Sequence, residues 1–583
     1  MIHYFDDFLK KLRQKDELLT VNRFIEPNLE IAEITDRQAS LPGGGKALLF
    51  NNTGTDFPVI SNIFSSENRI LMAFDMESTD EIYTRISGFY KAIAQNQAGN
   101  RFLRKPPFSE ITQYAPKTGN VGSCQEIALF PPDLNRIPFL RNRPYDQAHS
   151  IHEVPLIIRN PYMNSYSIES TRLLWHSKTT VQVRFEPDSQ SALLINNSPQ
   201  GRIPIALFFG GDPLYTLTSM IPRSVDVDPL LLNGYLRKKP IIMVPCLSQP
   251  LEVPENCDLV IEGYIDKNAQ TVPSVACGDN TGFYSIGGKE PLMHVTCITH
   301  RKNAMLPMIV PSLGQILSRR ALTRIISAFV ETNMEQSVAP GVRQLCYPYF
   351  GRCGSAAIVA IKKFYPGQTH KTAHAFWGSG ITSLNKVLVL VDEHVDVYDR
   401  SQVNECIRQH YNPSRDTFFG RGPLSLSDHA APQRGFGGKI CLDATAKSTA
   451  CTTSSSIPAE PYQFYHKSEK EPLKNRSEAL ILISVDEEID LNDRDMCLWM
   501  AISQTDPIRD TRIENGILYV DACTKKQGDR GVTKPWPNVC CSSMETIQTV
   551  DSYWDRLKAG DPITSPSYRI QALLRKGKAQ IME

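Results

Sequence analysis

The spacing of apolar residues along the first 112 residues alternates between that of helices and that of strands. Asp6–Leu12 and Ile82–Ala94 place apolar residues three and four positions apart, which is typical of helices buried on one face. Leu18–Val21 and Ala47–Phe50 are short, mostly apolar runs with the length of strands. This pattern predicts an N-terminal α/β domain over residues 1–112.

The pattern changes over residues 113–312, where short apolar runs follow one another between turn residues and prolines. Such spacing favours a barrel or sandwich of short strands. One helix is expected inside this region, because Asp228 can cap a helix and Pro229 suits its first position. The expected strands are Val154–Ile158, Thr180–Phe185, Ile203–Phe209, Pro240–Val244, Leu259–Tyr264 and His294–Ile298.

A connecting helix is expected next, and a second α/β region follows it. Leu313–Glu331 has helical spacing and lies within the predicted connector, residues 313–340. From residue 341 to the end, at 583, strand and helix patterns alternate again, which predicts a C-terminal α/β domain.

This C-terminal region contains an internal repeat, over residues 387–447 and 480–525. Each copy has an apolar strand ending in Asp-Glu, then Pro-x-Arg-Asp, then Asp-Ala-x-x-Lys. We therefore predict a duplicated α/β unit that packs against its twin. A segment rich in Ser, Thr, Pro and Lys, residues 449–475, is predicted as the loop that joins the copies.

Composition and charge narrow the class of protein. The chain has 63 basic and 62 acidic residues, a formal net charge of +1, and 41% hydrophobic residues. This balance is that of an ordinary globular protein and indicates no nucleic-acid partner. No run approaches the roughly 18 apolar residues of a membrane span, and the charged N-terminal segment lacks the apolar stretch of a secretory signal. We expect a cytoplasmic protein, with peripheral attachment to the inner membrane as an alternative.

Polar residues that could carry chemistry gather in the central region, which is predicted to be rich in strands. Arg172 follows Ser170 and Thr171, and the planar fork of an arginine suits a carboxylate; the alternative is a surface ion pair. Asp279 lies in the run Gly-Asp-Asn-Thr-Gly, residues 278–282, which on its own is typical of a turn.

Motifs in three parts of the chain are similar to those of one protein family. They are Leu29–Ile34, Val260–Tyr264 with Gly278–Gly282, and Gly437–Thr445. In this order they resemble the UbiD family, decarboxylases that use prenylated FMN, and the chain length is most similar to the branch linked to menaquinone synthesis through futalosine. The resemblance implies a multidomain α+β and α/β fold, with a central split β-barrel like that of flavin reductases and a C-terminal oligomerisation domain.

The resemblance also implies a site for prenylated FMN, whose phosphate is held through a divalent metal, Mn²⁺ or Mg²⁺, with K⁺ as a further candidate. Decarboxylation leaves a carbanion, and the flavin supplies the electron sink that no side chain supplies. The implied catalytic residues are Arg172, which orients the substrate carboxylate, and Asp279, which donates the proton. The implied cofactor-binding residues are Ser170, Thr171, Arg172, Arg184 and Lys439, and the implied metal ligands are Ser167, Asp188 and Asp228.

Four positions depart from the pattern of the family. The resemblance implies Asn, His and Glu as metal ligands where this chain has Ser167, Asp188 and Pro229, the last beside Asp228. It also implies a glutamate five residues before the acid, completing an Arg–Glu–acid network, where this chain has Ser274. Asp is a competent ligand of a hard metal, Ser is a poor one and Pro is none.

Three functions are therefore compatible with the sequence. The first is an active carboxy-lyase with a modified metal shell, acting on an aromatic or unsaturated acid such as a hydroxynaphthoate- or hydroxybenzoate-type quinone precursor. A flavin prenyltransferase would supply its cofactor, and the chain would form a dimer or a hexamer. The second is a catalytically degenerate homologue that acts as a binding or structural subunit. The third, an unrelated flavin oxidoreductase on a similar barrel, is supported by shared architecture alone.

Overall fold

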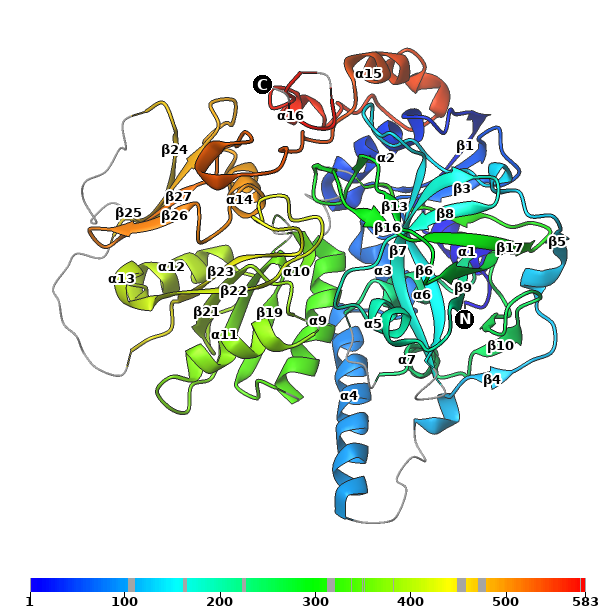
Figure 1. The fold of residues 1–583 in the computed structure, drawn as a ribbon, viewed down its shortest axis with the longest axis horizontal. Helices are drawn as coiled ribbons and strands as arrows, with labels where there is room; N and C mark the ends of the chain where they lie inside the picture. The colour runs from blue at the N-terminus through cyan, green and yellow to red at the C-terminus, as the bar shows by residue number, and fades with distance from the viewer. Residues whose placement is uncertain are drawn as a thin grey trace. The chain divides into compact units, whose positions relative to one another are not determined.

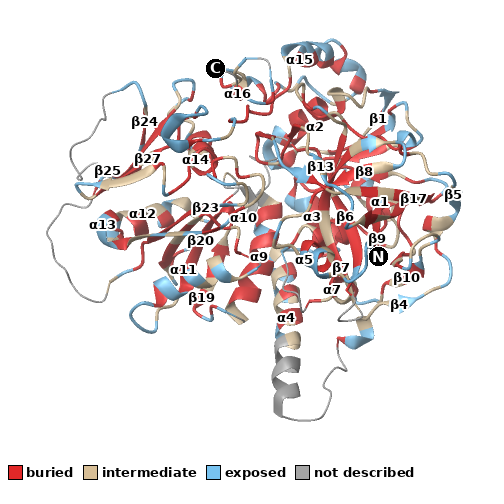
Figure 2. Ribbon diagram, viewed as in Figure 1, coloured by how far each residue is buried: buried red, intermediate tan, exposed pale blue. Residues whose placement is uncertain are grey.

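The computed structural model describes residues 2–102, 111–160, 165–222, 227–311, 320–336, 338–348, 350, 352–380, 382–447, 458–469, 479–576 and 578–581. The chain forms two compact units (Figure 1). Unit 1 comprises Met1–Ile325 and Val539–Gln571, and unit 2 comprises Ile326–Asn538 and Ala572–Glu583. Within each unit the buried residues gather along the strands (Figure 2).

Unit 1 begins with a sheet whose strands follow the order β1-β2-β3-β18. Because β18 comes after the barrel in sequence, the predicted N-terminal domain and the barrel share this sheet. Helix α1 buries Phe5, Phe8, Leu9 and Leu12 along one face, as its apolar spacing predicts. The elements are α1 (Phe5–Gln14), β1 (Leu18–Phe24), α2 (Glu30–Ser40), β2 (Ala47–Asn52), β3 (Val59–Ser61), α3 (Glu67–Phe74), α4 (Thr79–Phe102) and β18 (Leu306–Pro307).

A closed antiparallel β-barrel forms the centre of unit 1, and the predicted barrel is thereby confirmed. Its strands follow the order β12-β9-β6-β7-β8-β17, and β12 pairs with β17 to close the ring. Side chains alternate between the two faces of a strand, so every second residue, such as Leu173 and Leu207, enters the apolar core. The strands are β6 (Ser150–Asn160), β7 (Ser165–Ser177), β8 (Thr180–Val183), β9 (Arg202–Phe209), β12 (Leu259–Asp266) and β17 (Leu292–His300), with β5 (Ile127–Leu129) added beside β17.

Helices and small sheets fill the connections between barrel strands. The predicted helix at Asp228 is confirmed as α7, and the Asp228 side chain accepts a hydrogen bond from Leu230 N at 2.8 Å. Two short hairpins, β13 with β16 and β14 with β15, precede β17. The elements are β4 (Lys117–Thr118), α5 (Gln190–Asn197), α6 (Pro213–Ser219), α7 (Pro229–Arg237), β10 (Ile242–Pro245), β11 (Glu252–Pro254), β13 (Val272–Pro273), β14 (Cys277–Gly278), β15 (Tyr284–Ser285) and β16 (Lys289–Glu290).

Unit 2 contains two sheets, in the orders β19-β20-β21-β23-β22 and β24-β25-β27-β26. In each, three strands are parallel and the last strand pairs antiparallel with its neighbour. The elements are α9 (Arg320–Gln336), β19 (Val342–Cys346), α10 (Arg352–Ser355), β20 (Ala356–Ile361), α11 (Gln368–Gly378), β21 (Val387–Asp392), α12 (Arg400–His410), α13 (Pro413–Asp416), β22 (Thr417–Pro423), β23 (Phe436–Asp443), β24 (Glu460–His466), β25 (Ala479–Val485), α14 (Arg494–Ser503), β26 (Thr511–Glu514) and β27 (Ile517–Asp521).

The loops after α12 and α14 make matching hydrogen bonds in the two sheets. Asn412 N donates to Asp416 Oδ2 at 2.8 Å, and Asp506 N donates to Asp510 Oδ2 at 2.8 Å. Four strands of the first sheet have the same order and directions as the four strands of the second, while β19, antiparallel to β20, has no counterpart. The duplication stays a prediction. The prediction of a loop throughout 449–475 is wrong for β24, which pairs in parallel with β25 although its surroundings are rich in Ser, Thr and Lys.

The C-terminal segment returns to unit 1, whereas the sequence prediction assigned all of 341–583 to one C-terminal domain. Helix α15 (Met544–Asp551) packs on α2, and the short helix α16 (Tyr568–Gln571) ends the segment. Arg37 of α2 donates to Glu33, to Asp551 at 2.6 Å and to the carbonyl of Ile547 at 3.1 Å. In the part of the chain that the structure describes, no helix combines the length and the apolar character that crossing a membrane requires.

Arg37→Ala is expected to lower the free energy of unfolding by about 3–5 kcal/mol, because it leaves the buried Glu33 carboxylate without its partner. The matched control is Arg136→Ala, which breaks the half-exposed pair with Asp56 and costs about 1 kcal/mol or less. Urea denaturation measures both values, and equal losses in the two variants would contradict the role of Arg37.

Candidate active site

Strand β7 carries the predicted arginine on the outer face of the barrel. Leu173 points into the apolar core, so the alternation of a strand places Arg172 and Ser170 on the opposite face. Thr171 lies on the inner face, and its hydroxyl donates to the carbonyl of Arg184 at 2.6 Å. Of the three neighbouring residues predicted to contact the cofactor, Ser170 and Arg172 thus share a face, and Thr171 does not.

Two buried arginines and two buried carboxylates meet on this outer face. Arg172 Nη2 donates to Glu290 Oε1 at 3.0 Å, and Arg172 Nη1 lies 3.9 Å from Asp279 Oδ2. Arg184 Nη1 donates to Asp279 Oδ2 at 3.2 Å and to Ser285 Oγ at 3.1 Å. The structure therefore brings together three residues predicted from the sequence, Arg172, Asp279 and Arg184, and adds Glu290.

The electrostatic balance of this cluster keeps Arg172 charged. Burial alone lowers the pKa of the Arg172 guanidinium, but the charges of Glu290 and Asp279 outweigh burial, and the pKa is raised. Only 6% of the Arg172 side chain and 3% of the Glu290 side chain are exposed. A fixed positive charge in such a place is suited to an anionic ligand.

Three buried polar atoms of Arg172 and Glu290 have no hydrogen-bond partner among the described residues. They are Arg172 Nε, Arg172 Nη1 and Glu290 Oε2. A buried donor or acceptor without a partner costs about 1–3 kcal/mol, and more when it is charged. The two arginine nitrogens are donors that fit the oxygens of a carboxylate or of a flavin.

The loop that carries Asp279 is held from two sides. Asp279 Oδ1 accepts from Thr281 N at 3.2 Å, which stabilises the turn that the Gly-Asp-Asn-Thr-Gly run predicts. From the C-terminal segment, Cys540 N donates to the carbonyl of Gly282 at 2.8 Å. A Cβ at Gly278 would lie 2.8 Å from Arg143, so only glycine fits between this loop and its neighbours.

The three predicted metal ligands have other partners or positions in unit 1. Ser167 is buried and donates to Gln190 Oε1 at 3.1 Å, and Asp228 caps α7. Asp188 lies just before α5, whose first backbone N–H groups bind Glu169 at 3.0 and 2.8 Å. No group of three or more His, Cys, Asp or Glu side chains among the residues described could hold a metal ion. Metal binding by Ser167, Asp188 and Asp228 stays a prediction, and we assign no step to a metal.

Lys439 lies buried in β23 of unit 2. Its Nζ donates to the carbonyls of Ser383 at 2.6 Å and Asn385 at 2.5 Å. The glycine before it, Gly438, donates its N–H to Asp506 Oδ2 at 2.7 Å within the same unit. The contact of Lys439 with a cofactor stays a prediction.

Sequence reasoning missed Glu290 and underestimated Glu262. Glu290 follows Gly287-Gly288-Lys289, a run typical of an exposed turn, so only its long-range pairing reveals its burial. Glu262 belongs to the Val-Ile-Glu-Gly-Tyr motif, and a charged residue near the end of a predicted strand is ordinarily exposed. Glu262 is buried and accepts from Leu247 N at 2.9 Å and Ser248 N at 2.6 Å, which gives it a structural role.

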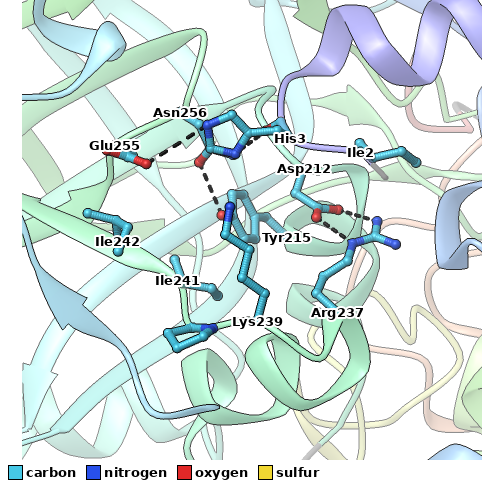
Figure 3. A pocket seen from close by; sticks show the side chains of 11 residues that line it. Ile2, His3, Asp212, Tyr215, Arg237, Lys239, Ile241, Ile242, Glu255 and Asn256 are labelled. Atoms are coloured by element: carbon cyan, nitrogen blue, oxygen red, sulfur yellow. Dashed lines mark hydrogen bonds and ion pairs between the residues drawn. The ribbon is translucent and has the colours of Figure 1, made fainter. Parts of the chain in front are cut away.

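A small pocket elsewhere on unit 1 is lined by apolar and polar side chains, and several of the polar ones bind one another (Figure 3). Asp212 pairs with Arg237 at 2.5 Å, and Tyr215 Oη donates to Asn256 Oδ1 at 3.1 Å. None of the residues predicted as catalytic, cofactor-binding or metal-binding lines this pocket, and its lining does not support an active site.

Comparison with known proteins places most of the chain in one class. Residues 9–87, 117–313 and 322–444 match the N-terminal, Rift-related and C-terminal domains of 3-octaprenyl-4-hydroxybenzoate carboxy-lyase. The fold and its motifs are thus those of a carboxy-lyase of this type. The chain belongs to the UbiD family, as its motifs predict. Its place in the menaquinone branch stays a prediction.

Relatives and solved structures agree with this assignment. An uncharacterized protein of Aquifex aeolicus is 32% identical over 449 residues, covering 76% of this chain and 91% of the relative. Vanillic acid decarboxylase of Sedimentibacter hydroxybenzoicus, in its closed form, has a TM-score of 0.70 at 18% identity and covers 78% of this chain and 95% of its own. The enzyme HmfF of Pelotomaculum thermopropionicum, in complex with prenylated FMN, has a TM-score of 0.59 at 20% identity and covers 76% and 95%. At these identities the structures show a shared fold.

Proposed function

We propose that this protein is a carboxy-lyase that releases CO₂ from an aromatic or α,β-unsaturated acid with prenylated FMN as cofactor. The observation that carries the proposal is the buried Arg172, which has two nitrogens without a hydrogen-bond partner, one of which, Nη1, lies 3.9 Å from the carboxylate of Asp279. An anion-binding donor beside an acid is what a reaction that starts from a carboxylate and ends with a protonated carbon requires.

The position of each side chain in the cluster gives it a separate role in the reaction. Arg172 binds and orients the substrate carboxylate through its unpartnered nitrogens. Asp279 gives its proton to the carbon that loses CO₂. Arg184, which donates to Asp279 at 3.2 Å, fixes the direction of that carboxyl group. Burial of all three excludes water, which strengthens each of these interactions.

The residues present fit an anionic or carbonyl-bearing cofactor on the outer face of β7, where Ser170 and the unpartnered atoms of Arg172 lie. Prenylated FMN, when bound, supplies the electron sink for decarboxylation. HmfF has been solved with prenylated FMN and with FMN, which supports a flavin here. A flavin prenyltransferase would provide the cofactor.

The substrate we favour is a hydroxybenzoate- or hydroxynaphthoate-type acid. Two structural relatives are decarboxylases of vanillic acid and of 3,4-dihydroxybenzoic acid, and both substrates are hydroxylated aromatic acids. A homo-oligomer, dimeric or hexameric, would be formed through the C-terminal domain; one relative, HmfF, has been solved in an evolved dimeric form.

The second candidate function is that of a degenerate homologue acting as a binding or structural subunit. Its support is the absence, among the residues described, of a carboxylate-rich metal site, together with Ser167 and Pro229 at positions where the family resemblance implies ligands.

Expression together with a flavin prenyltransferase separates the two functions. The active enzyme is expected to purify with the absorbance of a modified flavin and to release CO₂ from hydroxybenzoates or hydroxynaphthoates. A colourless protein that releases no CO₂ from either class would contradict the proposed enzyme and favour the structural subunit. Size-exclusion chromatography with light scattering of the same sample measures the oligomeric state.

A further inference from the structure

We infer that Glu290 is a positioning residue: it fixes the orientation and charge of Arg172 and thereby makes Asp279 the group that holds the proton when a carboxylic acid binds. This inference rests on the proposed decarboxylase function and adds a residue to it. The contact that carries it is the hydrogen bond from Arg172 Nη2 to Glu290 Oε1, at 3.0 Å, between two buried side chains.

Strand pairing places Glu290 in one row with the two arginines. Leu173 pairs with Val183, so Arg172 lies opposite Arg184, whose N–H donates to the Arg172 carbonyl at 3.2 Å. Val183 N donates to the carbonyl of Pro291 at 3.1 Å, so Glu290 follows as the next neighbour of Arg184. Like charges opposite one another repel, and a carboxylate in the same row offsets that repulsion.

The same strand pairing explains how Glu290 can replace the network glutamate that the family resemblance implies at position 274, where this chain has Ser274. Val272 pairs with Glu290, and Ser274 N donates to the carbonyl of Gly288 at 3.0 Å. Ser274 and Glu290 therefore lie on the same face of one hairpin as diagonal neighbours, which are roughly 7–8 Å apart and within reach of long side chains. The carboxylate that the family resemblance implies at residue 274 is supplied here from the opposite strand.

The number of charges in the cluster links Glu290 to the protonation state of Asp279. The buried cluster holds two guanidinium groups, Arg172 and Arg184, against two carboxylates, Glu290 and Asp279. A substrate carboxylate that binds Arg172 adds a third negative charge. Glu290 is hydrogen-bonded to Arg172 Nη2 at 3.0 Å, whereas Asp279 accepts from Arg184 at 3.2 Å and lies 3.9 Å from Arg172 Nη1, a nitrogen to which the substrate carboxylate can bind. The added charge therefore lies beside Asp279, and protonation of Asp279 offsets it, so that Asp279 then holds the proton that the product carbon needs.

Other charged or titratable groups border the cluster and do not replace Glu290. Glu186 lies 3.9 Å from Arg184 but is 32% exposed, and Glu153 accepts a hydrogen bond from Asn280 at 3.3 Å. Burial raises the pKa of the Cys277 thiol far above its ordinary value, so that this group stays neutral.

The test uses the flavin-loaded protein and 4-hydroxybenzoate as the probe acid. Calorimetry in two buffers that differ in ionisation enthalpy counts the protons taken up on binding. We expect about one proton per acid bound by the wild type and none by Glu290→Gln, since removal of one buried negative charge lets Asp279 stay ionised. The kcat of Glu290→Gln near pH 7 is expected to fall roughly 100-fold, as for the loss of a general acid, and the deficit is expected to shrink as the pH is lowered.

Relocating the carboxylate separates positioning from a merely structural role. The double variant Ser274→Glu/Glu290→Gln is expected to restore proton uptake and at least a tenth of wild-type kcat, a difference of about 1.4 kcal/mol or less from the wild type. Glu290→Asp, which keeps the charge, provides the second variant if Glu290→Gln does not fold, and it is expected to keep the proton uptake. Glu186→Gln is the matched control and is expected to change neither measurement.

The role of Glu290 would be overturned if Glu290→Gln took up as many protons as the wild type and kept its pH profile. It would also be overturned if the double variant recovered neither proton uptake nor kcat. Failure of the wild type to release CO₂ from any aromatic acid would instead contradict the proposed function, and calorimetry on the bound probe acid still measures the proton count.

Discussion

Arg172→Ala is expected to lower kcat/KM for CO₂ release by about 10³-fold. Truncating one partner of a buried, hydrogen-bonded charge pair costs roughly 2–5 kcal/mol, and about 4 kcal/mol corresponds to three decades of rate. The loss arises because the nitrogens without a partner in Arg172 are the donors that bind the substrate carboxylate. Steady-state kinetics of the flavin-loaded enzyme measures it.

The same change has a second effect, on stability. Removal of Arg172 leaves the buried Glu290 carboxylate without its hydrogen-bonded partner, at a cost of about 3–5 kcal/mol in the free energy of unfolding. Arg172→Lys keeps the charge but not the planar fork, so we expect it to retain more stability than Arg172→Ala while its activity stays low.

Lys178→Ala provides the control for Arg172. Lys178 is exposed in the turn between β7 and β8, close in sequence but outside the buried cluster. We expect its kcat/KM and its urea midpoint to equal those of the wild type. Full turnover by Arg172→Ala, with Lys178→Ala also unaffected, would show that another cation binds the acid.

The elements that local sequence determines were predicted well. Five of the six barrel strands overlap runs that the sequence predicts as strands, because a strand with one buried face needs apolar residues at alternate positions wherever it lies in the sheet. The sixth, β7, was not among the predicted strands, since polar residues such as Glu169 and Thr171 interrupt its apolar pattern. Helix α7 was predicted from Asp228 and Pro229 alone, because a cap and a proline act on the backbone next to them.

The features that the sequence concealed depend on distant partners. Glu290 is buried only because β16 leads into β17, which pairs with β8, and no local pattern contains that information. Strand β24 was hidden for the same reason: its hydrogen bonds to β25 make a strand of a segment that locally resembles a loop. The return of the C-terminal segment to α2 rests on single contacts, such as Arg37 with Asp551, that leave no periodic signal.

In the candidate site, too, local motifs were predicted from the sequence and the contact between distant segments was not. The motif around Asp279 and the position of Arg172 could be carried over from the family because they lie within short, uninterrupted runs. The sequence has Ser274 where the family resemblance implies the glutamate of the Arg–Glu–acid network, and this single position suggested that the network carboxylate had been lost. The structure shows a carboxylate on the facing strand of the same hairpin, so the loss of a residue type at one position need not remove the charge from the site.

Asp279→Asn is expected to abolish turnover, with kcat reduced by about 10²–10⁴-fold, while the protein stays folded. Asparagine keeps the size of the side chain and an oxygen that can accept from Thr281 N and Arg184, so the loop geometry is retained. It has no proton to give to the carbon that loses CO₂. Two measurements check this: CO₂ release, and incorporation of solvent deuterium into the product at the carbon that carried the carboxyl group.

The control for Asp279 is Asp266→Asn, at the end of β12, where the carboxylate accepts from Asn268 N at 2.9 Å on the surface. This variant is expected to retain wild-type turnover. Wild-type rates of CO₂ release and of deuterium incorporation in Asp279→Asn would refute its role as the acid and would require another proton donor on this face of the barrel. A variant that unfolds at the wild-type temperature but forms no labelled product would support it, because a side chain that only maintained the fold could not give that combination.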